Sequence, residues 1–195
     1  KKICHLYQHS KKILFIDLDN TIWDGVIGDD GLENIRYTPE TSQGRIFYDI
    51  QCYIKYLKEN EKIIATVSKN EEKIALSALK SENMILNIED FVEYKINWKP
   101  KSTNIIEVLD KLNLQSDSAV FFDDNPVERY EVKNNVPGIL VPELNTGPEE
   151  FIDTLNRYDY FFNIDKGTDK YLRKTEMYQN NKARDRHRKT FKNHE

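Results

Sequence analysis

Near its start the chain reads Ile13-Leu-Phe-Ile-Asp17-Leu-Asp19-Asn20-Thr21, an apolar run that ends in two carboxylates, an amide and a hydroxyl. An uninterrupted apolar run of this length is typical of a strand that is buried on both faces of a parallel sheet. Carboxylates directly after such a strand are costly to bury without a compensating charge. The pattern therefore predicts a functional site at the end of this strand.

A second run of the same kind reads Ala119-Val-Phe-Phe-Asp123-Asp124-Asn125-Pro126. Ligands of open α/β sheets bind outside the carboxyl ends of the strands, so we expect the two acidic pairs to meet there. Four carboxylates in one place repel one another unless a divalent cation lies among them, and hard oxygen ligands suit Mg²⁺. We therefore predict a Mg²⁺ site formed by Asp17, Asp19, Asp123 and Asp124, with Asp124 preferred over Asp123 for direct contact.

Strand-like and helix-like segments alternate along the chain. Strands are expected at residues 13–18, 62–67, 91–96, 119–123 and 138–141. Helices are expected at about 40–59, 70–81, 102–113, 126–134 and 148–157. This alternation predicts an α/β fold with a doubly wound parallel sheet and helices on both of its faces.

Four segments describe the expected domain organisation. Residues 12–165 form the expected catalytic domain, after an N-terminal extension at 1–11. Within the domain, residues 23–39 hold three glycines and predict a turn-rich excursion or small β-hairpin, which would overhang the acidic site as a flap in place of a large cap domain. Residues 166–195 are strongly polar and predict a solvated helix or linker. The chain begins with Lys1 rather than Met, so we expect a domain of a larger protein.

Composition excludes several classes of function. The net charge of −4 over 195 residues gives no basic patch for nucleic acid. No apolar run approaches the length of a membrane span, and no signal-peptide pattern opens the chain. Cys4 and Cys52 have neither metal-binding nor redox spacing, and a disulfide between them is not expected in what we interpret as a cytoplasmic enzyme.

The residue types of the predicted site suit phosphoryl transfer. Asp17 can attack phosphorus to form an aspartyl-phosphate, which divides one difficult step into two easier ones. Asp19 lies on the same side of an extended strand and can act as general acid and base, while its backbone carbonyl can face the metal. Either acidic pair alone could consist of aspartates that only end a strand or form a turn. This alternative is a poor explanation for two such pairs in one chain.

Phosphate oxygens also need donors and positive charge. Ser68 follows the second strand and can bind phosphate together with the N–H groups of the next helix, or it can simply cap that helix. Lys101 is preferred over Lys99 as the phosphate-binding lysine because it lies at the expected helix start. The full set of candidate substrate-binding residues beside Lys101 is Asn20, Thr21, Trp23, Ser68, Lys69, Asn70 and Asn125.

These motifs resemble the four motifs of the haloacid dehalogenase superfamily, and within it the FkbH-like proteins. The resemblance covers about residues 12–180. It is carried by Asp17-Leu-Asp-Asn-Thr-Ile-Trp-Asp-Gly-Val-Ile-Gly-Asp-Asp-Gly, Ser68-Lys-Asn, Asn97-Trp-Lys-Pro-Lys101-Ser, Phe122-Asp-Asp-Asn-Pro-x-Glu-Arg and Thr175-Glu-Met-Tyr178.

The resemblance implies a function in polyketide synthase loading. FkbH-like proteins capture a three-carbon acyl phosphate, typically 1,3-bisphosphoglycerate, lose phosphate and deliver the acyl group to an acyl carrier protein. It implies Asp17 as nucleophile, Asp19 as acid/base, Ser68 and Lys101 as phosphate ligands, and Asp124 with Asp123 at a Mg²⁺ site. A short flap in place of a large cap would admit the phosphopantetheine arm of the carrier.

The chain departs from that pattern at Val67, where many members carry a cysteine that could hold the acyl group as a thioester. Cys52 is poorly placed to substitute, so we expect direct transfer to the thiol of the carrier, and the acyl group could also be of the lactyl type.

Two other functions use similar residues. An ordinary phosphatase of the same fold, acting on a phosphoprotein or a small phosphomonoester, has identical chemical motifs. A receiver-type phosphorylation switch also has clustered aspartates, a hydroxyl and a lysine. In a receiver, however, the acidic pair follows the first strand and the lysine comes late, whereas here Asp123 and Asp124 come after Lys101.

Overall fold

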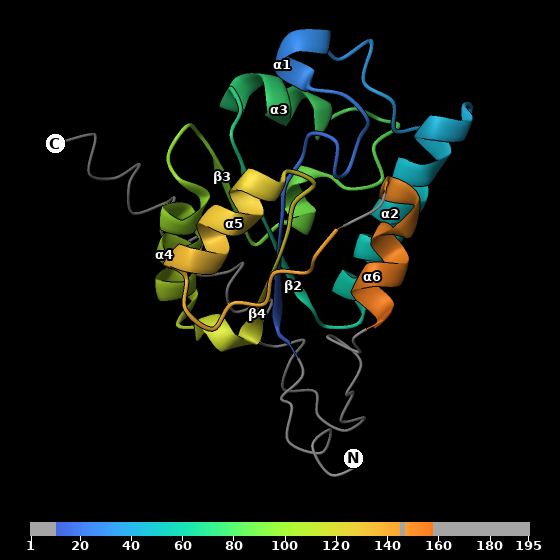
Figure 1. Cartoon of the computed structure of the whole chain (residues 1–195). Coiled ribbons are helices and arrows are strands. Elements are labelled where there is room, and N and C mark those ends of the chain that lie inside the picture. The colour runs from blue at the N-terminus through green and yellow to red at the C-terminus, as the bar shows by residue number, and fades with distance from the viewer. Residues whose placement is uncertain (1–10, 145–146, 158–195) are drawn as a thin grey trace, which may run out of the picture. The chain divides into compact units, whose positions relative to one another are not determined.

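The computed structural model describes residues 11–144 and 147–157 (Figure 1). The predicted extension at 1–11, apart from Lys11, lies outside the described residues, as do residues 158–165 at the end of the predicted domain. The polar segment 166–195 and the Thr175–Tyr178 motif lie outside them as well. In the part of the chain that the structure describes, no helix has the length and apolar character that crossing a membrane requires.

Four parallel strands form one sheet in the order β3-β2-β1-β4. They are β1 (Ile13–Ile16), β2 (Ile63–Ser68), β3 (Glu93–Ile96) and β4 (Ala119–Phe122). All residues of β1, β2 and β4 are buried, as the apolar runs predict. The central strand β1 pairs with β2 on one side and with β4 on the other, so the segments after β1 and β4 leave the sheet side by side.

The predicted fifth strand at 138–141 is wrong. Leu140 makes only a single parallel bridge to Val120, with hydrogen bonds of 2.9 Å from Phe121 N–H to Leu140 O and 3.1 Å from Leu140 N–H to Ala119 O. The segment is enclosed by Pro137 and Pro142, and proline has no N–H group to extend a ladder. The apolar residues at 139–141 therefore pack beside β4 without forming a strand of their own.

Helices cover both faces of the sheet, as expected (Figure 1). In that view α4 (Lys101–Leu112) and α5 (Pro126–Asn135) lie on one side, and α2 (Ser42–Glu59) and α6 (Phe151–Arg157) lie on the other. The shorter α3 (Glu72–Ala78) follows β2, and the 3-10 turns are η2 (Ile88–Asp90), η3 (Ser116–Ser118) and η4 (Pro148–Glu150). The predicted helix ranges agree with these bounds to within a few residues.

The segment 23–39 is a closed loop rather than a β-hairpin. Its base is a single antiparallel bridge between Asp24 and Arg36, with backbone hydrogen bonds of 2.9 and 3.0 Å and an ion pair of 2.5 Å between the side chains. The loop carries the short helix α1 (Ile27–Asp30), which packs against α3. Gly25 has a φ of 104°, a conformation that a side chain would strain, and this explains a glycine at the turn.

A buried glutamine connects this loop to the rest of the fold. The Gln51 side chain on α2 donates to Ile22 O at 2.7 Å and accepts from the N–H groups of Ile85 and Leu86 at 3.0 and 3.2 Å. Because Gln51 is fully buried, leaving these groups unpaired would be costly. The contact fixes the backbone just after Thr21, where the first acidic motif ends.

Candidate active site

Three carboxylates meet at the carboxyl edge of the sheet. Asp17 follows β1, Asp123 and Asp124 follow β4, and the pairing of Ile16 with Phe122 places the two motifs side by side. The Asp17 N–H continues the ladder with a 3.0 Å hydrogen bond to Phe122 O. One oxygen of each carboxylate lies within 4.8 Å of the others, so the predicted convergence of the two acidic motifs is present.

Lys101 lies within this cluster. It is the first residue of α4, only 2% exposed, and its Nζ lies 2.9 Å from Asp17 Oδ1 and 2.6 Å from Asp123 Oδ2. Burial alone would lower the pKa of Lys101, but the charges of Asp17 and Asp123 outweigh burial and raise it. Lys101 therefore carries a positive charge at neutral pH. Lys99 instead pairs with Glu107 at the surface, so the choice between the two lysines agrees with the structure.

The cluster fits a hard divalent cation. Three carboxylates face one lysine, which leaves an excess of negative charge in a largely buried place. Asp17 Oδ1 is buried and accepts no hydrogen bond besides its ion pair with Lys101. Burial, together with the charge of Asp17, raises the pKa of Asp123 to about 7 and that of Asp124 to about 6. Carboxylate oxygens that are buried and short of positive charge are the donor set that Mg²⁺ accepts.

The side chain of Asp19 lies outside this group of carboxylates. Its Oδ1 accepts from Trp23 Nε1 at 2.8 Å and from Ile27 N–H at 3.0 Å, and its Oδ2 accepts from Asn70 Nδ2 at 2.7 Å. Burial raises the pKa of Asp19, and the charge of Asp17 adds to the rise against these hydrogen bonds. The sequence grouped the Asp19 carboxylate with the metal ligands, whereas the structure separates it from them and holds it by three donors.

Trp23 and Asn70, two of the predicted substrate-binding residues, hold Asp19 instead. Trp23 is fully buried and its one polar atom is committed to Asp19, and Asn70 is 4% exposed. Direct contact with substrate is therefore closed to Trp23. The loop that carries Ile27 also contributes a donor to Asp19, so residues 23–39 contact the acidic site, and their role as a flap stays a prediction.

Four other predicted residues have structural partners. The Thr21 hydroxyl is buried and lies 3.3 Å from both the N–H and Oδ1 of Asp124. Asn20 has a φ of 50° and accepts from Gly25 N–H at 3.0 Å. Asn125 caps α5 by accepting from Val127 N–H at 2.9 Å, and Lys69 pairs with Glu128 at 2.7 Å. Thr21 and Asn125 thus orient the second acidic motif, and neither side chain is free as it stands.

Ser68 ends β2 and is 2% exposed. It does not cap the following helix, because the residue before α3 is Glu71, whose side chain makes no capping hydrogen bond. Ser68 is therefore not a helix cap, and phosphate binding by its hydroxyl stays a prediction. The preceding Val67 is fully buried within the sheet.

Sequence reasoning assigned no role to Arg129, which braces the second acidic motif. This 7% exposed side chain on α5 donates from Nη1 to the carbonyl oxygens of Asp123 and Asp124 at 2.9 and 2.6 Å, and from Nη2 to Leu144 O at 3.2 Å. Arg129 is the last residue of the Phe122-Asp-Asp-Asn-Pro-x-Glu-Arg motif, and this position could have indicated a role in the site. Only the fold shows which atoms its side chain contacts.

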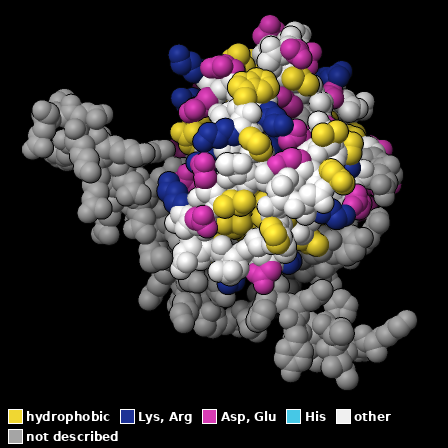
Figure 2. Space-filling view, turned by 60° about the vertical axis from the view of Figure 1, so that its left-hand side comes forward, with side chains coloured by type: hydrophobic (Ala, Val, Ile, Leu, Met, Phe, Trp, Pro, Cys, Tyr) yellow, Lys and Arg dark blue, Asp and Glu magenta, His cyan; other side chains and the backbone are white. Residues whose placement is uncertain are grey.

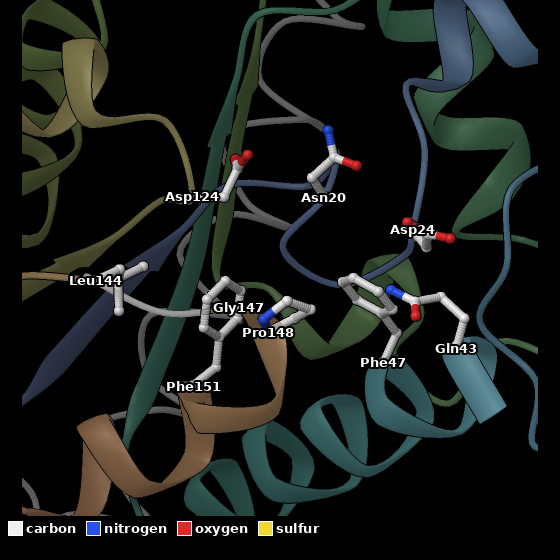
Figure 3. A pocket seen from close by; sticks show the side chains of 9 residues that line it. All are labelled: Asn20, Asp24, Gln43, Phe47, Asp124, Leu144, Gly147, Pro148 and Phe151. Atoms are coloured by element: carbon white, nitrogen blue, oxygen red, sulfur yellow. The ribbon is translucent and has the colours of Figure 1, made fainter.

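A pocket of about 250 Å³ opens beside Asp124 (Figure 3). Asn20 and Asp124 lie on its side toward the acidic cluster, and Phe47 and Phe151 lie opposite them. The lining residues are Asn20, Asp24, Gln43, Phe47, Asp124, Leu144, Gly147, Pro148 and Phe151. The arrangement offers a space next to the reactive carboxylates for the rest of a substrate.

No protein-family model matches the chain, and no curated protein matches it. Among solved structures, it is similar to the N-terminal part of the protein BF1531 from Bacteroides fragilis, which contains a phosphatase domain and is complexed with Mg. The sequences are 42% identical, with a TM-score of 0.73, and the match covers 77% of this chain and 40% of that chain. This chain thus spans less than half the length of that relative.

Two remote similarities complete the comparison. One is to a HAD family enzyme from Bacteroides thetaiotaomicron in complex with magnesium and inorganic phosphate, with 14% identity, a TM-score of 0.46, and coverage of 70% of this chain and 96% of that chain. The other is to a HAD-superfamily hydrolase from Geobacter sulfurreducens, with 12% identity, a TM-score of 0.45, and coverage of 74% and 96%. Similarity at this level says nothing about activity.

These similar structures do not show that the chain is of the FkbH-like subtype. The strand order, the parallel pairing and the 42% identity to a phosphatase domain lead to a coarser conclusion. The chain has a Rossmannoid α/β fold with a parallel sheet between helices, and it is similar to the phosphatase domain of BF1531.

Proposed function

We propose that the chain is a Mg²⁺-dependent phosphatase in which Asp17 is the nucleophile. One observation carries the proposal: the carboxylates of Asp17, Asp123 and Asp124 lie within 4.8 Å of one another, and Lys101 pairs with two of them. These three side chains, with the backbone carbonyl of Asp19, would hold Mg²⁺. The bound cation would neutralise charge on the phosphoryl group. The Mg complex of the BF1531 phosphatase domain supports this choice of cation.

In the first step an Asp17 oxygen attacks phosphorus and the bond from phosphorus to the leaving oxygen breaks. Asp19 donates its proton to that oxygen, and its raised pKa is the property such a general acid needs. Trp23, Ile27 and Asn70 fix the direction of its carboxyl group. Lys101 and Ser68 bind the phosphoryl oxygens. The products are an aspartyl-phosphate on Asp17 and a protonated leaving group.

In the second step water attacks the phosphorus of the aspartyl-phosphate. Asp19, now ionised, takes the proton of that water, and the bond between phosphorus and the Asp17 oxygen breaks. Inorganic phosphate leaves, and both aspartates return to their starting states. Lys101 supplies positive charge to the phosphoryl oxygens in both steps.

The resemblance to FkbH-like proteins supports a more specific form of this activity. The substrate is then a three-carbon acyl phosphate of the 1,3-bisphosphoglycerate type, and the partner is an acyl carrier protein. The carrier thiol attacks the acyl carbon and displaces the acyl-bound phosphate, while the Asp17 chemistry hydrolyses the ester phosphate. Val67 occupies the position of the expected cysteine, so the acyl group passes directly to the carrier. Cys52 lies on α2 and is not in a disulfide.

The second candidate is a phosphatase of a phosphoprotein or small phosphomonoester without acyl transfer. The site residues are the same for both functions. What separates them is whether phosphate release requires, and is coupled to, acylation of a carrier protein. In either case residues 12–165 would be the catalytic domain of a larger protein, in line with the match to only 40% of BF1531.

The test is to incubate the protein with Mg²⁺, 1,3-bisphosphoglycerate and candidate carrier proteins, then weigh the carrier and measure phosphate. The loading function predicts a glyceryl adduct on the carrier that Asp17→Asn abolishes together with phosphate release. Phosphate release without an adduct would leave the plain phosphatase. An acylated cysteine on the protein itself would contradict direct transfer. Unchanged turnover in Asp17→Asn would contradict the nucleophile.

A further inference from the structure

We propose that the pocket beside Asp124 binds the leaving group of the substrate and selects an uncharged, hydrogen-bonding group over one that carries a second negative charge. This inference rests on the proposed phosphatase function, and it names the chemical class of the substrate.

The position of the pocket gives the first argument. Asp124 belongs both to the acidic cluster and to the pocket lining, and Asn20, from the first acidic motif, lines the same pocket (Figure 3). A phosphoryl group held at Asp17 lies within a few ångströms of this opening, because one Asp17 oxygen is within 4.8 Å of one Asp124 oxygen. The group attached to the phosphorus therefore has this space next to it.

The lining of the pocket combines apolar side chains with two amides and two carboxylates. Phe47, Leu144, Pro148 and Phe151 supply carbon surface. Gln43 lies at the start of α2, and its amide makes no hydrogen bond to any residue that the structure describes. Asn20 uses its Oδ1 for Gly25 N–H, and its Nδ2 has no partner among the same residues. Two amides without partners, next to apolar side chains, suit a short ligand that carries hydroxyl or amide groups.

Charge gives the selectivity. No Lys, Arg or His is among the lining residues that the structure describes, whereas Asp24 and Asp124 both are. Arg36 offsets Asp24, but its side chain is 58% exposed and its charge is screened by water. A carboxylate or second phosphate on the leaving group would lose its hydration in this pocket without gaining a Lys, Arg or His partner among the described lining residues. In the loading function the Asp17 chemistry would therefore act after the carrier thiol has displaced the acyl-bound phosphate, when the leaving group is an uncharged thioester.

The pocket is small and firmly supported. Its volume of about 250 Å³ lies below the ~300–1,000 Å³ of pockets for drug-sized ligands. Phe151 packs edge-on against Phe122, the last residue of β4, with ring centroids 5.1 Å apart. Tyr53 on α2 donates to Asn156 on α6 at 2.7 Å, and Arg129 holds the backbone of Leu144. These contacts hold the walls of the pocket in place relative to the acidic cluster.

Figure 2 shows that the surface around α4 and α5 offers no equivalent site, because positive, negative and apolar side chains alternate there without a continuous patch of one kind. The most exposed large apolar side chains of the described residues are Trp98, in the loop before α4, and Val127 and Tyr130 on α5. Nothing in the structure identifies what would cover them, so the pocket carries the inference.

The test uses two phosphomonoesters that share a three-carbon skeleton. Glycerol 3-phosphate carries a hydroxymethyl group where 3-phosphoglycerate carries a carboxylate. With Mg²⁺ present we expect kcat/KM to be at least about tenfold higher for glycerol 3-phosphate, which corresponds to about 1.4 kcal/mol. Equal values, or a preference for 3-phosphoglycerate, would overturn the inference while leaving the phosphatase function intact. No Asp17-dependent turnover of either ester would instead count against the proposed function.

A variant pair then locates the selectivity. Gln43→Lys places a cation in the pocket and should raise the 3-phosphoglycerate to glycerol 3-phosphate ratio at least about tenfold. Ser42→Lys adds the same charge one residue earlier, at an exposed position outside the lining, and should leave the ratio within about twofold. An equal change of the substrate ratio in both variants would mean that the overall electrostatic potential of the protein sets the selectivity. That result would contradict a role for the pocket. Thermal melting confirms that both variants are folded.

Discussion

Lys101 Nζ lies 2.6 Å from Asp123 Oδ2 and also contacts Asp17, so a single buried cation joins the acidic ends of β1 and β4. The two strands contribute the negative charges, and α4 contributes the positive one. This relationship explains how the cluster is stable before any metal binds, and why a further divalent cation is still needed to balance three carboxylates.

The first prediction concerns Lys101. Lys101→Ala leaves Asp17 and Asp123 without their shared cation and removes a phosphate-binding charge, so kcat should fall about 10²- to 10³-fold. Lys99→Ala is the matched control, because Lys99 pairs only with the exposed Glu107, and its kcat should stay within about twofold of wild type. A similar loss in both variants would show that general positive charge, not the Lys101 contact, matters.

The second prediction concerns metal and pH. Without metal, folding raises the pKa of Asp123 to about 7 and that of Asp124 to about 6, whereas both ionise near pH 4 in the unfolded chain. The folded state therefore binds more protons between these values, and the metal-free protein should lose stability as pH rises from about 4 to 7.

Binding of Mg²⁺ requires the ionised carboxylates, so added Mg²⁺ should raise the melting temperature more at pH 8 than at pH 5. Differential scanning fluorimetry with and without chelator measures both effects. A Mg²⁺-induced shift that is the same at the two pH values would contradict ligation by Asp123 and Asp124.

The third prediction separates Asp19 from the residues that hold it. Asp19→Asn should lower kcat about 10²- to 10⁴-fold for an alkyl phosphate, whose leaving oxygen needs a proton. The loss should be smaller for p-nitrophenyl phosphate, whose leaving group is a weak base. Equal losses for the two substrates would argue against a general-acid role.

Trp23→Phe keeps the buried ring and removes one donor to Asp19. Since that hydrogen bond lowers the pKa of Asp19, its loss should raise this pKa further. The limb of the kcat–pH profile that Asp19 governs should move to higher pH, with little change in melting temperature. An unmoved limb would mean that the contact is only structural.

The fourth prediction tests a structural ion pair far from the chemistry. Asp90 in η2 is 3% exposed, pairs with Lys55 at 2.7 Å and with Lys58, and accepts from Asn87 N–H at 3.0 Å. Burial alone would raise the pKa of Asp90, but the two lysines and Asn87 outweigh burial and lower it. Asp90→Asn should cost about 2 kcal/mol of unfolding free energy at pH 7.

A lowered carboxyl pKa stabilises the fold above the unfolded value, and this stabilisation is lost as pH falls through the folded value. The difference between wild type and Asp90→Asn should therefore shrink once the pH drops below about 4. Urea denaturation at several pH values measures it. A pH-independent difference would assign the effect to packing instead of charge.

The sequence predicted the parts of the site that follow from strand ends. Asp17 and Asp124 could be paired because parallel strands bring their carboxyl ends to one edge, and Lys101 could be preferred over Lys99 from its place at a helix start. Both inferences use only local pattern and a general property of α/β sheets. The fold class was accessible for the same reason.

The contacts made by residues distant in sequence could not be predicted. Trp23 and Asn70 are polar or aromatic residues near the motifs, so the sequence assigned them to substrate, whereas the fold uses both to hold Asp19. Arg129 and Phe151 reach the site only through the packing of α5 and α6. The apolar run at 138–141 resembles a strand, but the prolines on both sides of it limit its pairing to a single bridge.

The most direct test of the central claim is to map the phosphorylated residue. The protein is mixed with substrate and Mg²⁺, quenched in acid within the turnover time, digested, and analysed by mass spectrometry. We expect one phosphoryl group on the peptide that contains Asp17, dependent on Mg²⁺ and absent from Asp17→Asn. A phosphoryl group on another residue, or full turnover by Asp17→Asn, would contradict the account.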